Sequence, residues 1–554
     1  MRKKITKPHL PHWAAVCALA LAGIIAYHNC LNNAMFWDDD DFILKNRYIK
    51  DWQYFPKFFS ENLVAGGYLL SNYWRPVLLT VFAWAWHIWH TWLPGWHSLN
   101  IAFHILDGIL LYFLFNRLFA NRILSAIAAL IFTTHPVHNE AIVYVNSLGD
   151  PLAAFFVLSS LLLFARFRQS GKPAYASRNF WFAFLLYPLA IMSKETGFVL
   201  CGLLPAMDFL LLQTNASCRT RVKNTLSAAW PFLAIAVIYV ILRGTALNFS
   251  DSFNFYHEQN EFTGSIFIRV LTFFKAAAQY TGFLFFPYEL RVERQMPWAH
   301  SLLEGDVLLG GLIITAMAIA LFKYWKKDPL LSFAFAWFFI AIAPASNVLV
   351  PINAVIYEHF LYMPMIGITL ATVNAALRLV EQKNIPRPGA AALVLILAVF
   401  CAINVRRNTD WRTAIGFYEQ LVQYAPSYRV INNLGMEYAN KGIHDKAEFW
   451  YKKAIAMDPA NPVAYHNIAG TYRDTGRLAL AEANFKKAIT LNPKFIFSYR
   501  SLAELYWRLG DFAQAKKYLI TLVNFDPQDQ NARQALQTVD NLIKQNRGGI
   551  DGTH

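Results

Sequence analysis

The sequence predicts an all-α protein in two parts, a polytopic membrane domain over residues 1–405 and a helical repeat array over residues 406–554. Composition is the first reason. The chain is 56% hydrophobic and 16% aromatic, and its 15% of charged residues lies below the ~25% typical of soluble domains. Two patterns complete the prediction: long apolar stretches recur as far as Val405, and a 34-residue period follows them.

The N-terminus predicts an uncleaved first membrane span. The string MRKKITKPH is basic, and an apolar run from Trp13 to Tyr27 follows it. A signal peptide would end in a small-residue cleavage site, but this run leads into Asn32 and an acidic loop. We therefore expect its basic end to face the cytoplasm.

Ten further apolar stretches bring the predicted number of spans to eleven. They are 97–115, 121–135, 150–165, 179–192, 196–213, 225–242, 305–322, 329–345, 359–379 and 389–405. Every second loop is rich in Lys and Arg, whereas loops such as 135–149 and 346–358 contain neither residue. Because basic loops stay in the cytoplasm, this alternation predicts an inside N-terminus and an outside C-terminal domain.

Two more apolar stretches would break this alternation if they crossed the membrane. Residues 76–93 contain several Trp and two His residues, which suit the membrane interface. Residues 266–286 end in FLFFPYEL. We expect both to form helices that lie on, or dip into, the outer face.

The 34-residue period after Val405 matches the tetratricopeptide helix–turn–helix repeat. Small residues recur where paired helices approach each other, and a glycine recurs where the first helix of each pair should end. The residues in register are Tyr438/Tyr472/Tyr506, Gly442/Gly476/Gly510, Ala447/Ala481/Ala515 and Pro459/Pro493/Pro527. Residues 411–428 resemble the second helix of an incomplete repeat, and residues 529–545 resemble a capping helix.

Net charge and cysteines exclude other classes of protein. The net charge of +15 lies largely in short loops between apolar stretches, so we predict no nucleic-acid partner. The five cysteines are scattered without a CxxC motif, which indicates neither a disulfide framework nor a zinc site.

The string MFWDDDDFILKN places four carboxylates, Asp38 to Asp41, just after the first span. Adjacent carboxylates repel each other and cannot be buried without a partner. Acidic residues in the first outer loop are the usual site of chemistry in membrane glycosyltransferases that use a lipid-phosphate sugar donor. The simpler interpretation is a solvated acidic loop, and this string alone favours neither.

Other polar side chains gather in the predicted outer loops: Arg75, His138, Glu140, Lys194, Glu195, Arg243, Glu358 and His359. Each alone is better explained as an anchor at the end of a span. Collectively they place carboxylates and cations on the same membrane face as Asp38–Asp41. This combination suits transfer of a group from an anionic lipid to a hydroxyl.

Such a reaction explains the residue types. A polyprenyl-phosphate sugar already has a good leaving group, so the enzyme needs a carboxylate base to take the acceptor hydroxyl proton. It also needs Arg and Lys to hold the phosphate as negative charge develops. We predict no resident cofactor. His135 and His138 are three residues apart beside a proline, which is weak support for a metal site, and a divalent metal stays open.

The motifs FWDDDDFILKN, YWRPVLLT, HPVHNEAIVYVNSLGD, SKETGFVL, LRGT and YEHFLYMPMIG, in this order before the repeats, resemble the transmembrane and tetratricopeptide O-mannosyltransferases. That family has the C-type glycosyltransferase fold. The resemblance implies transfer of mannose from a polyprenyl-phosphate carrier to Ser or Thr of a protein. It places the family's acidic pair on Asp38 and Asp39, and it implies functional roles for Glu140, Lys194 and Glu195.

The chain departs from the family pattern in two places. It has Glu358-His359 where the family has Glu-Arg, and it has the additional Asp40 and Asp41. A histidine holds phosphate only when protonated or as a neutral donor, so the donor is less well defined than the fold. The array is short, which favours a bacterial inner-membrane enzyme with its active site and repeats in the periplasm.

Two alternatives stay open from the sequence. The same fold can transfer a sugar to a lipid or a glycan, or the chain can be a non-catalytic membrane-anchored repeat scaffold. An anchor needs one span rather than eleven, which argues against the scaffold. The expected partners are therefore the lipid-linked sugar, an acceptor protein bound by the repeats, and membrane lipids.

Overall fold

The computed structural model describes residues 10–548 except 215, 251–258, 288, 353, 384, 385, 526 and 528. The chain divides into two compact units, Met1–Thr413 and Ala414–His554. The described residues form helices and turns without a β-strand, so the all-α prediction is confirmed. Helix α16, which runs from Pro386 to Asn408, continues through the predicted domain boundary at residue 405.

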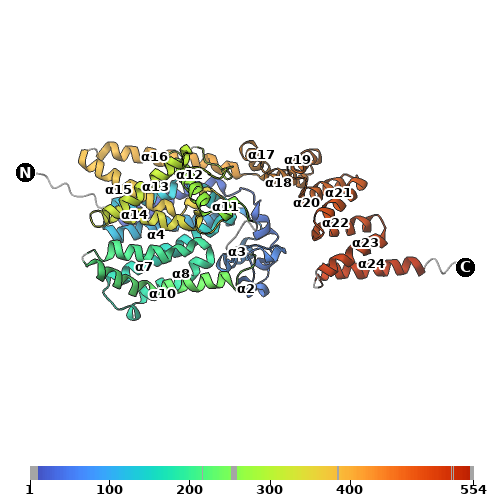
Figure 1. Cartoon of the computed structure of the whole chain (residues 1–554), viewed down its shortest axis with the longest axis horizontal. Helices are drawn as coiled ribbons and strands as arrows, with labels where there is room; N and C mark the ends of the chain where they lie inside the picture. Colours follow the sequence, from blue (N-terminus) through green and yellow to red (C-terminus); the bar gives the residue numbers. More distant parts are fainter. Residues whose placement is uncertain are drawn as a thin grey trace, which may run out of the picture. The chain divides into compact units, whose positions relative to one another are not determined.

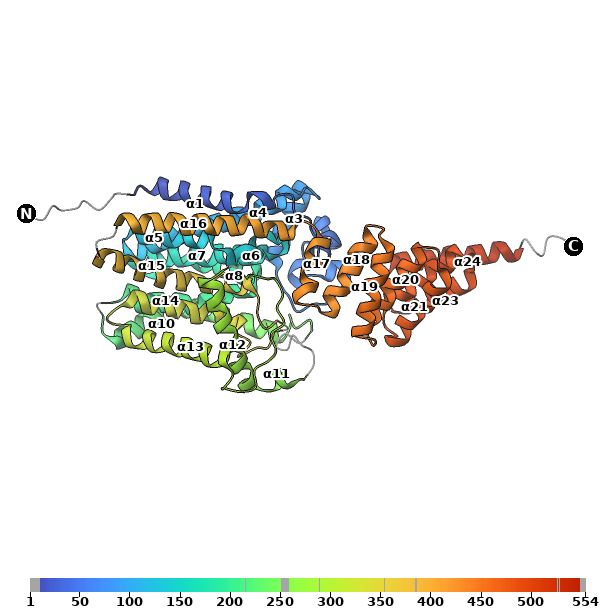
Figure 2. The ribbon, with the colours of Figure 1, turned by 90° about the horizontal axis from the view of Figure 1, so that it is seen from above.

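The first unit is a bundle whose long helices run side by side, as both ribbon views show (Figures 1 and 2). Every one of the eleven predicted apolar stretches is helical. The helices are α1 (His12–Tyr27), α4 (Leu93–Phe119), α5 (Arg122–Thr134), α7 (Gly149–Gln169), α8 (Arg178–Ser193), α9 (Leu200–Met207), α10 (Cys218–Gly244), α13 (Gly305–Tyr324), α14 (Pro329–Ile342), α15 (Pro364–Lys383) and α16. Three single-turn helices lie in the loops: α2 (Lys57–Ser60), α6 (Asn139–Val143) and α11 (Glu261–Gly264).

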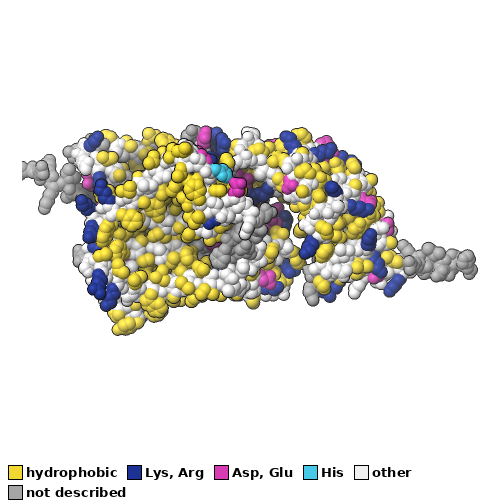
Figure 3. Space-filling view, viewed as in Figure 1, with side chains coloured by type: hydrophobic (Ala, Val, Ile, Leu, Met, Phe, Trp, Pro, Cys, Tyr) yellow, Lys and Arg dark blue, Asp and Glu magenta, His cyan; other side chains and the backbone are white. Residues whose placement is uncertain are grey.

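Seven helices of the described chain are long and apolar enough to cross a membrane. Three apolar helices are shorter, over Pro76–Trp89, Arg122–Thr134 and Pro329–Ala345. Hydrophobic side chains cover much of the unit's visible face, and Lys and Arg gather at its left end (Figure 3). The chain is thus an integral membrane protein, and the count of eleven spans stays a prediction.

The two stretches predicted at the membrane interface are also helical, as α3 (Pro76–Trp89) and α12 (Ile266–Phe285). Helix α12 runs beside the first half of α13, because Leu271 packs beside Val307 and Phe274 beside Gly310. A Cβ atom on Gly310 would collide with the Phe274 carbonyl group, so the glycine permits this close approach.

Asparagines join the end of α16 to the end of α1 inside the bundle. Asn408 is fully buried; its side-chain amide donates to the Ala26 carbonyl oxygen at 2.9 Å and to Asn29 Oδ1 at 2.6 Å. Asn139 Nδ2 donates to Asn408 Oδ1 at 2.7 Å. Buried amides need such partners, and here they fix the segment around residue 139 against both helices.

The second unit is a stack of helical hairpins. Its helices are α17 (Ala414–Tyr424), α18 (Tyr428–Asn440), α19 (His444–Met457), α20 (Pro462–Asp474), α21 (Leu478–Leu491), α22 (Ile496–Arg508), α23 (Phe512–Phe525) and α24 (Gln530–Gly548). The glycines predicted to end the first helix of each repeat have φ of +73°, +76° and +76°, at Gly442, Gly476 and Gly510. This left-handed conformation favours glycine, so the predicted helix ends are confirmed.

Candidate functional site

The acidic loop lies between α1 and α3, and it buries one of its four carboxylates. Asp39 is 1% exposed, and its Oδ1 accepts the backbone N–H of Asn146 at 2.8 Å. Among the described residues Asp39 forms no ion pair. Burial raises the pKa of Asp39 well above its ordinary value, and the neighbouring charge of Asp38 raises it further.

The other three carboxylates of the loop are more exposed. Asp40 and Asp41 both lie near Lys45 Nζ, at 3.3 and 3.6 Å, and the Asp41 side chain is 40% exposed. The Asp38 backbone N–H donates to the Tyr144 hydroxyl at 3.0 Å. The structure therefore separates Asp38 and Asp39, which face the loop around residue 145, from Asp40 and Asp41, which have a local lysine partner.

A stack of aromatic rings supports the loop. Phe36 stacks on Trp411, Trp411 on Tyr144, and Tyr144 on Trp37, with ring centroids 6.0, 5.3 and 5.7 Å apart. Trp37 has φ of +63°, a conformation that a bulky side chain rarely adopts. The stack holds this turn, and thereby the direction in which the chain enters Asp38 and Asp39.

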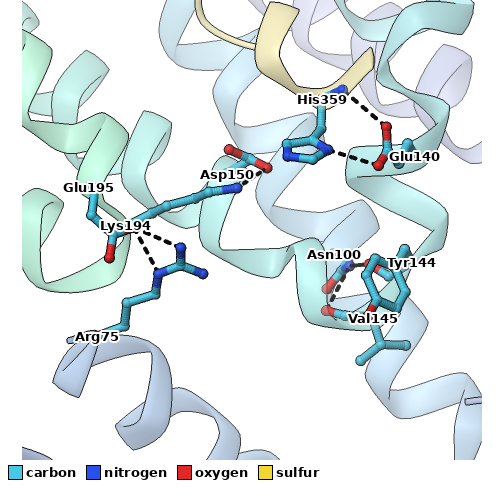
Figure 4. Close-up of polar contacts among 9 residues, drawn as sticks. All are labelled: Arg75, Asn100, Glu140, Tyr144, Val145, Asp150, Lys194, Glu195 and His359. Carbon is cyan, nitrogen blue, oxygen red and sulfur yellow. Dashed lines mark hydrogen bonds and ion pairs between the residues drawn. The ribbon is translucent and has the colours of Figure 1, made fainter. Parts of the chain in front are cut away.

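Lys194 and Glu195 meet different partners, although they are adjacent in the chain. The Lys194 backbone is extended at the end of α8, so the two side chains point in opposite directions. Lys194 Nζ lies 2.6 Å from Asp150 Oδ2 at the start of α7. Arg75 donates to Glu195 Oε2 from Nε at 3.0 Å and from Nη2 at 2.7 Å, as Figure 4 shows.

The segments around residues 140 and 359 form a third pair. His359 Nδ1 lies 2.8 Å from Glu140 Oε1, and the His359 backbone N–H donates to Glu140 Oε2 at 3.2 Å (Figure 4). Asn100 Nδ2, on α4, donates to the Tyr144 and Val145 carbonyl oxygens at 2.9 and 3.3 Å. The histidine that replaces the expected arginine is thus held by a carboxylate of the neighbouring motif.

Glu358 is completely buried between two arginines that sequence reasoning missed. Arg407 Nη2, at the end of α16, lies 2.9 Å from Glu358 Oε2, and Arg294 Nη2 lies 3.9 Å from Oε1. Burial raises the pKa of Glu358, and the charge of Arg407 opposes this shift. Arg407 follows an apolar span, and its neighbour is also an arginine, so the sequence presented it as an ordinary membrane boundary.

Two predicted site residues form contacts other than the pairs above, although the charge of Arg243 still acts on Glu195. Arg243 is buried and donates to the carbonyl oxygens of Leu247, at 3.0 Å, and Asn72, so it braces the segment that precedes Arg75. His138 points into the bundle, where its ring lies 4.6 Å from that of Phe132. Burial lowers the pKa of His138 well below its ordinary value, so the imidazole is neutral.

Several charged side chains of the site, and the tyrosines beside them, lie close enough to interact electrostatically. Tyr357 is partly exposed; desolvation of its hydroxyl raises its pKa, and the charges of Glu140 and Asp38 raise it further. Arg75 lies 4.5 Å from the centre of the Tyr73 ring, and the charge of Asp150 acts on Arg75. Among the described residues no group of three or more His, Cys, Asp or Glu side chains could hold a metal ion.

Together, these features define a class: an integral-membrane helical protein with a buried charged site and a repeat array. Family models for the tetratricopeptide repeat match residues 428–461, 450–483 and 473–539. A solved structure, "First TPR of Spaghetti (RPAP3) bound to HSP90 peptide SRMEEVD", is 26% identical over 21% of this chain and 95% of its own, with a TM-score of 0.20.

Curated relatives cover most of the chain. Protein O-mannosyl-transferase F38B6.6 of Caenorhabditis elegans is 26% identical over 450 residues, 79% of this chain and 62% of its own. The human Protein O-mannosyl-transferase TMTC4 is 23% identical over 500 residues, 80% of this chain and 66% of its own. The resemblance drawn from the motifs is thereby confirmed, and the chain spans slightly less than two thirds of these relatives' length.

Proposed function

We propose that this protein is an integral-membrane glycosyltransferase that moves mannose from a polyprenyl-phosphate donor to Ser or Thr hydroxyls of proteins. One observation carries the proposal: the motifs that carry the resemblance contribute the paired side chains of Figure 4 and the buried carboxylate of Asp39. The names of the relatives support mannosyl transfer to protein.

In the proposed reaction Asp39 acts as the general base and Asp38 assists it. The acceptor hydroxyl oxygen forms a bond to the sugar's anomeric carbon as the bond from that carbon to the phosphate oxygen breaks. Asp39 takes the hydroxyl proton, and the lipid phosphate leaves with the electron pair. A single in-line displacement of this kind inverts the anomeric centre.

Arg75 and Lys194 are the proposed phosphate ligands. Each is now paired with a carboxylate, Glu195 or Asp150, at hydrogen-bond distance. A donor phosphate would compete for these cations, which favours recognition of a dianionic or monoanionic lipid over a neutral one. Glu140 and His359 hold the adjacent part of the site through their own pair.

The proposed role of the repeat array is to bind the acceptor protein, since such arrays form extended concave surfaces. The charge alternation of the loops supports a site and an array on the outer face, which in a bacterium is the periplasm. Cysteine labelling at residues 168–178 should report cytoplasm and labelling after residue 413 should report the outside. The reverse result would remove this placement.

The test of function uses the purified full-length protein with radiolabelled polyprenyl-phosphate mannose and candidate acceptors. Label in protein that β-elimination releases supports the proposal. Label in a lipid or glycan supports the first alternative, and no turnover with any acceptor supports the scaffold. Glycoproteomics of a deletion strain identifies the acceptor, and EDTA treatment tests the divalent metal.

A further inference from the structure

A second set of titratable side chains lies deeper in the bundle and takes no part in the proposed reaction. His104 and Asp107 on α4 are completely buried, and Tyr362, just before α15, is 1% exposed. Tyr362 lies between the other two: its hydroxyl is 2.8 Å from His104 Nδ1 and 2.7 Å from Asp107 Oδ2. His104 Nε2 lies 3.0 Å from the Thr133 carbonyl oxygen.

Counting hydrogens along this chain of contacts shows that the usual protonation states leave one contact unsatisfied. The Thr133 carbonyl can only accept, so His104 Nε2 must carry a hydrogen. In a neutral imidazole Nδ1 is then an acceptor, and an ionised Asp107 is also an acceptor. The single hydroxyl hydrogen of Tyr362 can serve one of these two, and the other contact would oppose two lone pairs.

The other neutral tautomer of His104 also leaves one contact between two acceptors. With the hydrogen on Nδ1, His104 donates to Tyr362 and Tyr362 donates to Asp107, but Nε2 then opposes the Thr133 oxygen. An unmade hydrogen bond in a buried position is costly. One additional proton satisfies every contact, either on His104 as an imidazolium or on Asp107 as a carboxylic acid.

We infer that His104, Tyr362 and Asp107 form a buried site that binds one shared proton at neutral pH. The two arrangements of that proton differ only by transfer along the two hydrogen bonds through Tyr362. The Thr133 carbonyl is in the last turn of α5, whose partial negative charge favours the imidazolium. In this arrangement the negative charge of the Asp107 carboxylate balances the positive charge of the imidazolium.

The nearest side chains around the site are aromatic rings and a neutral histidine, which do not repel an additional proton. Tyr27 of α1 has its ring 5.6 Å from that of His104, and the rings of His104 and Tyr362 lie 5.5 and 4.8 Å from that of the neutral His138. Charges on other helices act from further away, with Asp150 acting on Tyr362 and Arg407 on Tyr27. The ring of His135 lies 6.4 Å from that of His138, and its Nε2 is held 3.0 Å from the Leu284 carbonyl oxygen.

The site also joins parts of the chain that the proposed reaction uses. The Tyr362 backbone N–H donates to the His359 carbonyl oxygen at 3.1 Å, and His138 lies two residues before Glu140. Loss of the shared proton would leave a buried unsatisfied contact at Tyr362, whose backbone is bonded to that of His359. We therefore expect the membrane domain to lose stability as pH rises above neutral.

The test measures the unfolding equilibrium constant of the full-length protein in mixed detergent and SDS micelles between pH 6.5 and 9. In Asp107→Asn the amide can donate to Tyr362 and Tyr362 to His104, so every contact is satisfied without an additional proton. Above about pH 6.5, where an unfolded histidine is neutral, folded wild type holds one more proton than unfolded wild type. The ratio of unfolding constants, wild type over variant, should rise up to tenfold per pH unit.

A constant ratio over this range would overturn the inference. Asp107→Val, which removes both acceptor oxygens and also frees Tyr362 to donate to His104, gives a second measurement if the asparagine variant does not fold. Asp208→Asn, which alters a buried carboxylate outside this site, is the matched control and should keep the wild-type dependence on pH. The measurement needs no transferase activity, so it is independent of the proposed function.

Discussion

Two buried aspartates at opposite ends of the membrane domain differ in how their charge is satisfied. Asp208, after α9, receives Arg168 Nε at 2.6 Å and Arg168 Nη2 at 3.1 Å, and the Thr225 hydroxyl at 2.8 Å. Asp39 receives backbone N–H groups, from Asn146 at 2.8 Å and from Phe36, and no cation among the described residues. Both side chains are at most 1% exposed, so burial alone does not distinguish them.

Helix α7 separates the two environments, since the Asn146 partner of Asp39 precedes its first turn and Arg168 is in its last turn. The helix has 21 residues and is about 30 Å long at a rise of about 1.5 Å per residue. A buried carboxylate with a bidentate arginine and a hydroxyl donor is complete and holds helices together. A buried carboxylate without a cation retains capacity to accept a proton or a donor group. The comparison thus separates a structural ion pair from a candidate site.

The largest expected effect is on stability, at Asp208. Asp208→Leu leaves Arg168 with a largely buried and unpaired charge, so we expect a loss of about 3–5 kcal/mol in the free energy of unfolding. SDS-titrated unfolding measures this, with transfer per folded molecule as the second readout. If the folded fraction also loses most of its transfer activity, Asp208 is more than a structural partner and the comparison fails.

Asp39→Asn should have a large effect on transfer and a small effect on stability, the opposite of Asp208→Leu. The amide oxygen of this variant can still accept the Asn146 N–H, so the fold is kept, but transfer should fall by ~10²-fold or more, the scale of losing a general base. Asp41→Asn is the matched control, because Asp41 is more exposed and lies near Lys45. Transfer from polyprenyl-phosphate mannose measures both. Equal rates for Asp38→Asn/Asp39→Asn and wild type would remove the catalytic assignment.

Substitutions of the cations should have the next largest effects. Loss of one charge-assisted contact typically costs about 1.5–3 kcal/mol, so Arg75→Ala and Lys194→Ala should each weaken donor use by roughly tenfold or more. Arg243→Ala should act mainly through stability, because its guanidinium bonds backbone carbonyls. Donor titrations at saturating acceptor separate the two effects. A pure loss of stability in Arg75→Ala would exclude it as a phosphate ligand.

The smallest effect is a dependence on pH with opposite signs for transfer and stability. Because burial raises the pKa of Asp39, its carboxyl becomes protonated at a higher pH than an ordinary aspartate, and transfer should decline there as pH falls. The folded state then binds this proton more tightly than the unfolded state. Stability from Asp39 is therefore present at low pH and is lost as pH rises through the raised pKa.

Paired measurements of transfer and unfolding from acidic to alkaline pH check this prediction. Asp39→Asn should remove the dependence of transfer and reduce that of stability, to which the raised pKa of Glu358 also contributes, while Asp41→Asn keeps the dependence of transfer. If transfer and stability of wild type instead change in the same direction with pH, a group other than Asp39 governs the loss of transfer at low pH.

Pattern alone predicts the elements well. The apolar runs locate the helices of the membrane domain, and the 34-residue period locates the repeats, including the left-handed glycines Gly442, Gly476 and Gly510. It does not locate individual side chains. The sequence groups His138 with the outer face, but the side chain points into the bundle, and it presents Arg407 as a boundary residue, although Arg407 lies against Glu358.

The sequence by itself determined the helices, the repeats and the set of polar motifs, because apolar period and turn residues act over a few residues of chain. It also indicated that these motifs share one end of the bundle, through the alternation of basic loops. The tertiary structure decided which groups meet: Lys194 with Asp150, Arg75 with Glu195, Glu140 with His359, and Tyr362 with His104 and Asp107. These partners are 44 to 258 residues apart, and only helix packing brings such distant positions within hydrogen-bond distance.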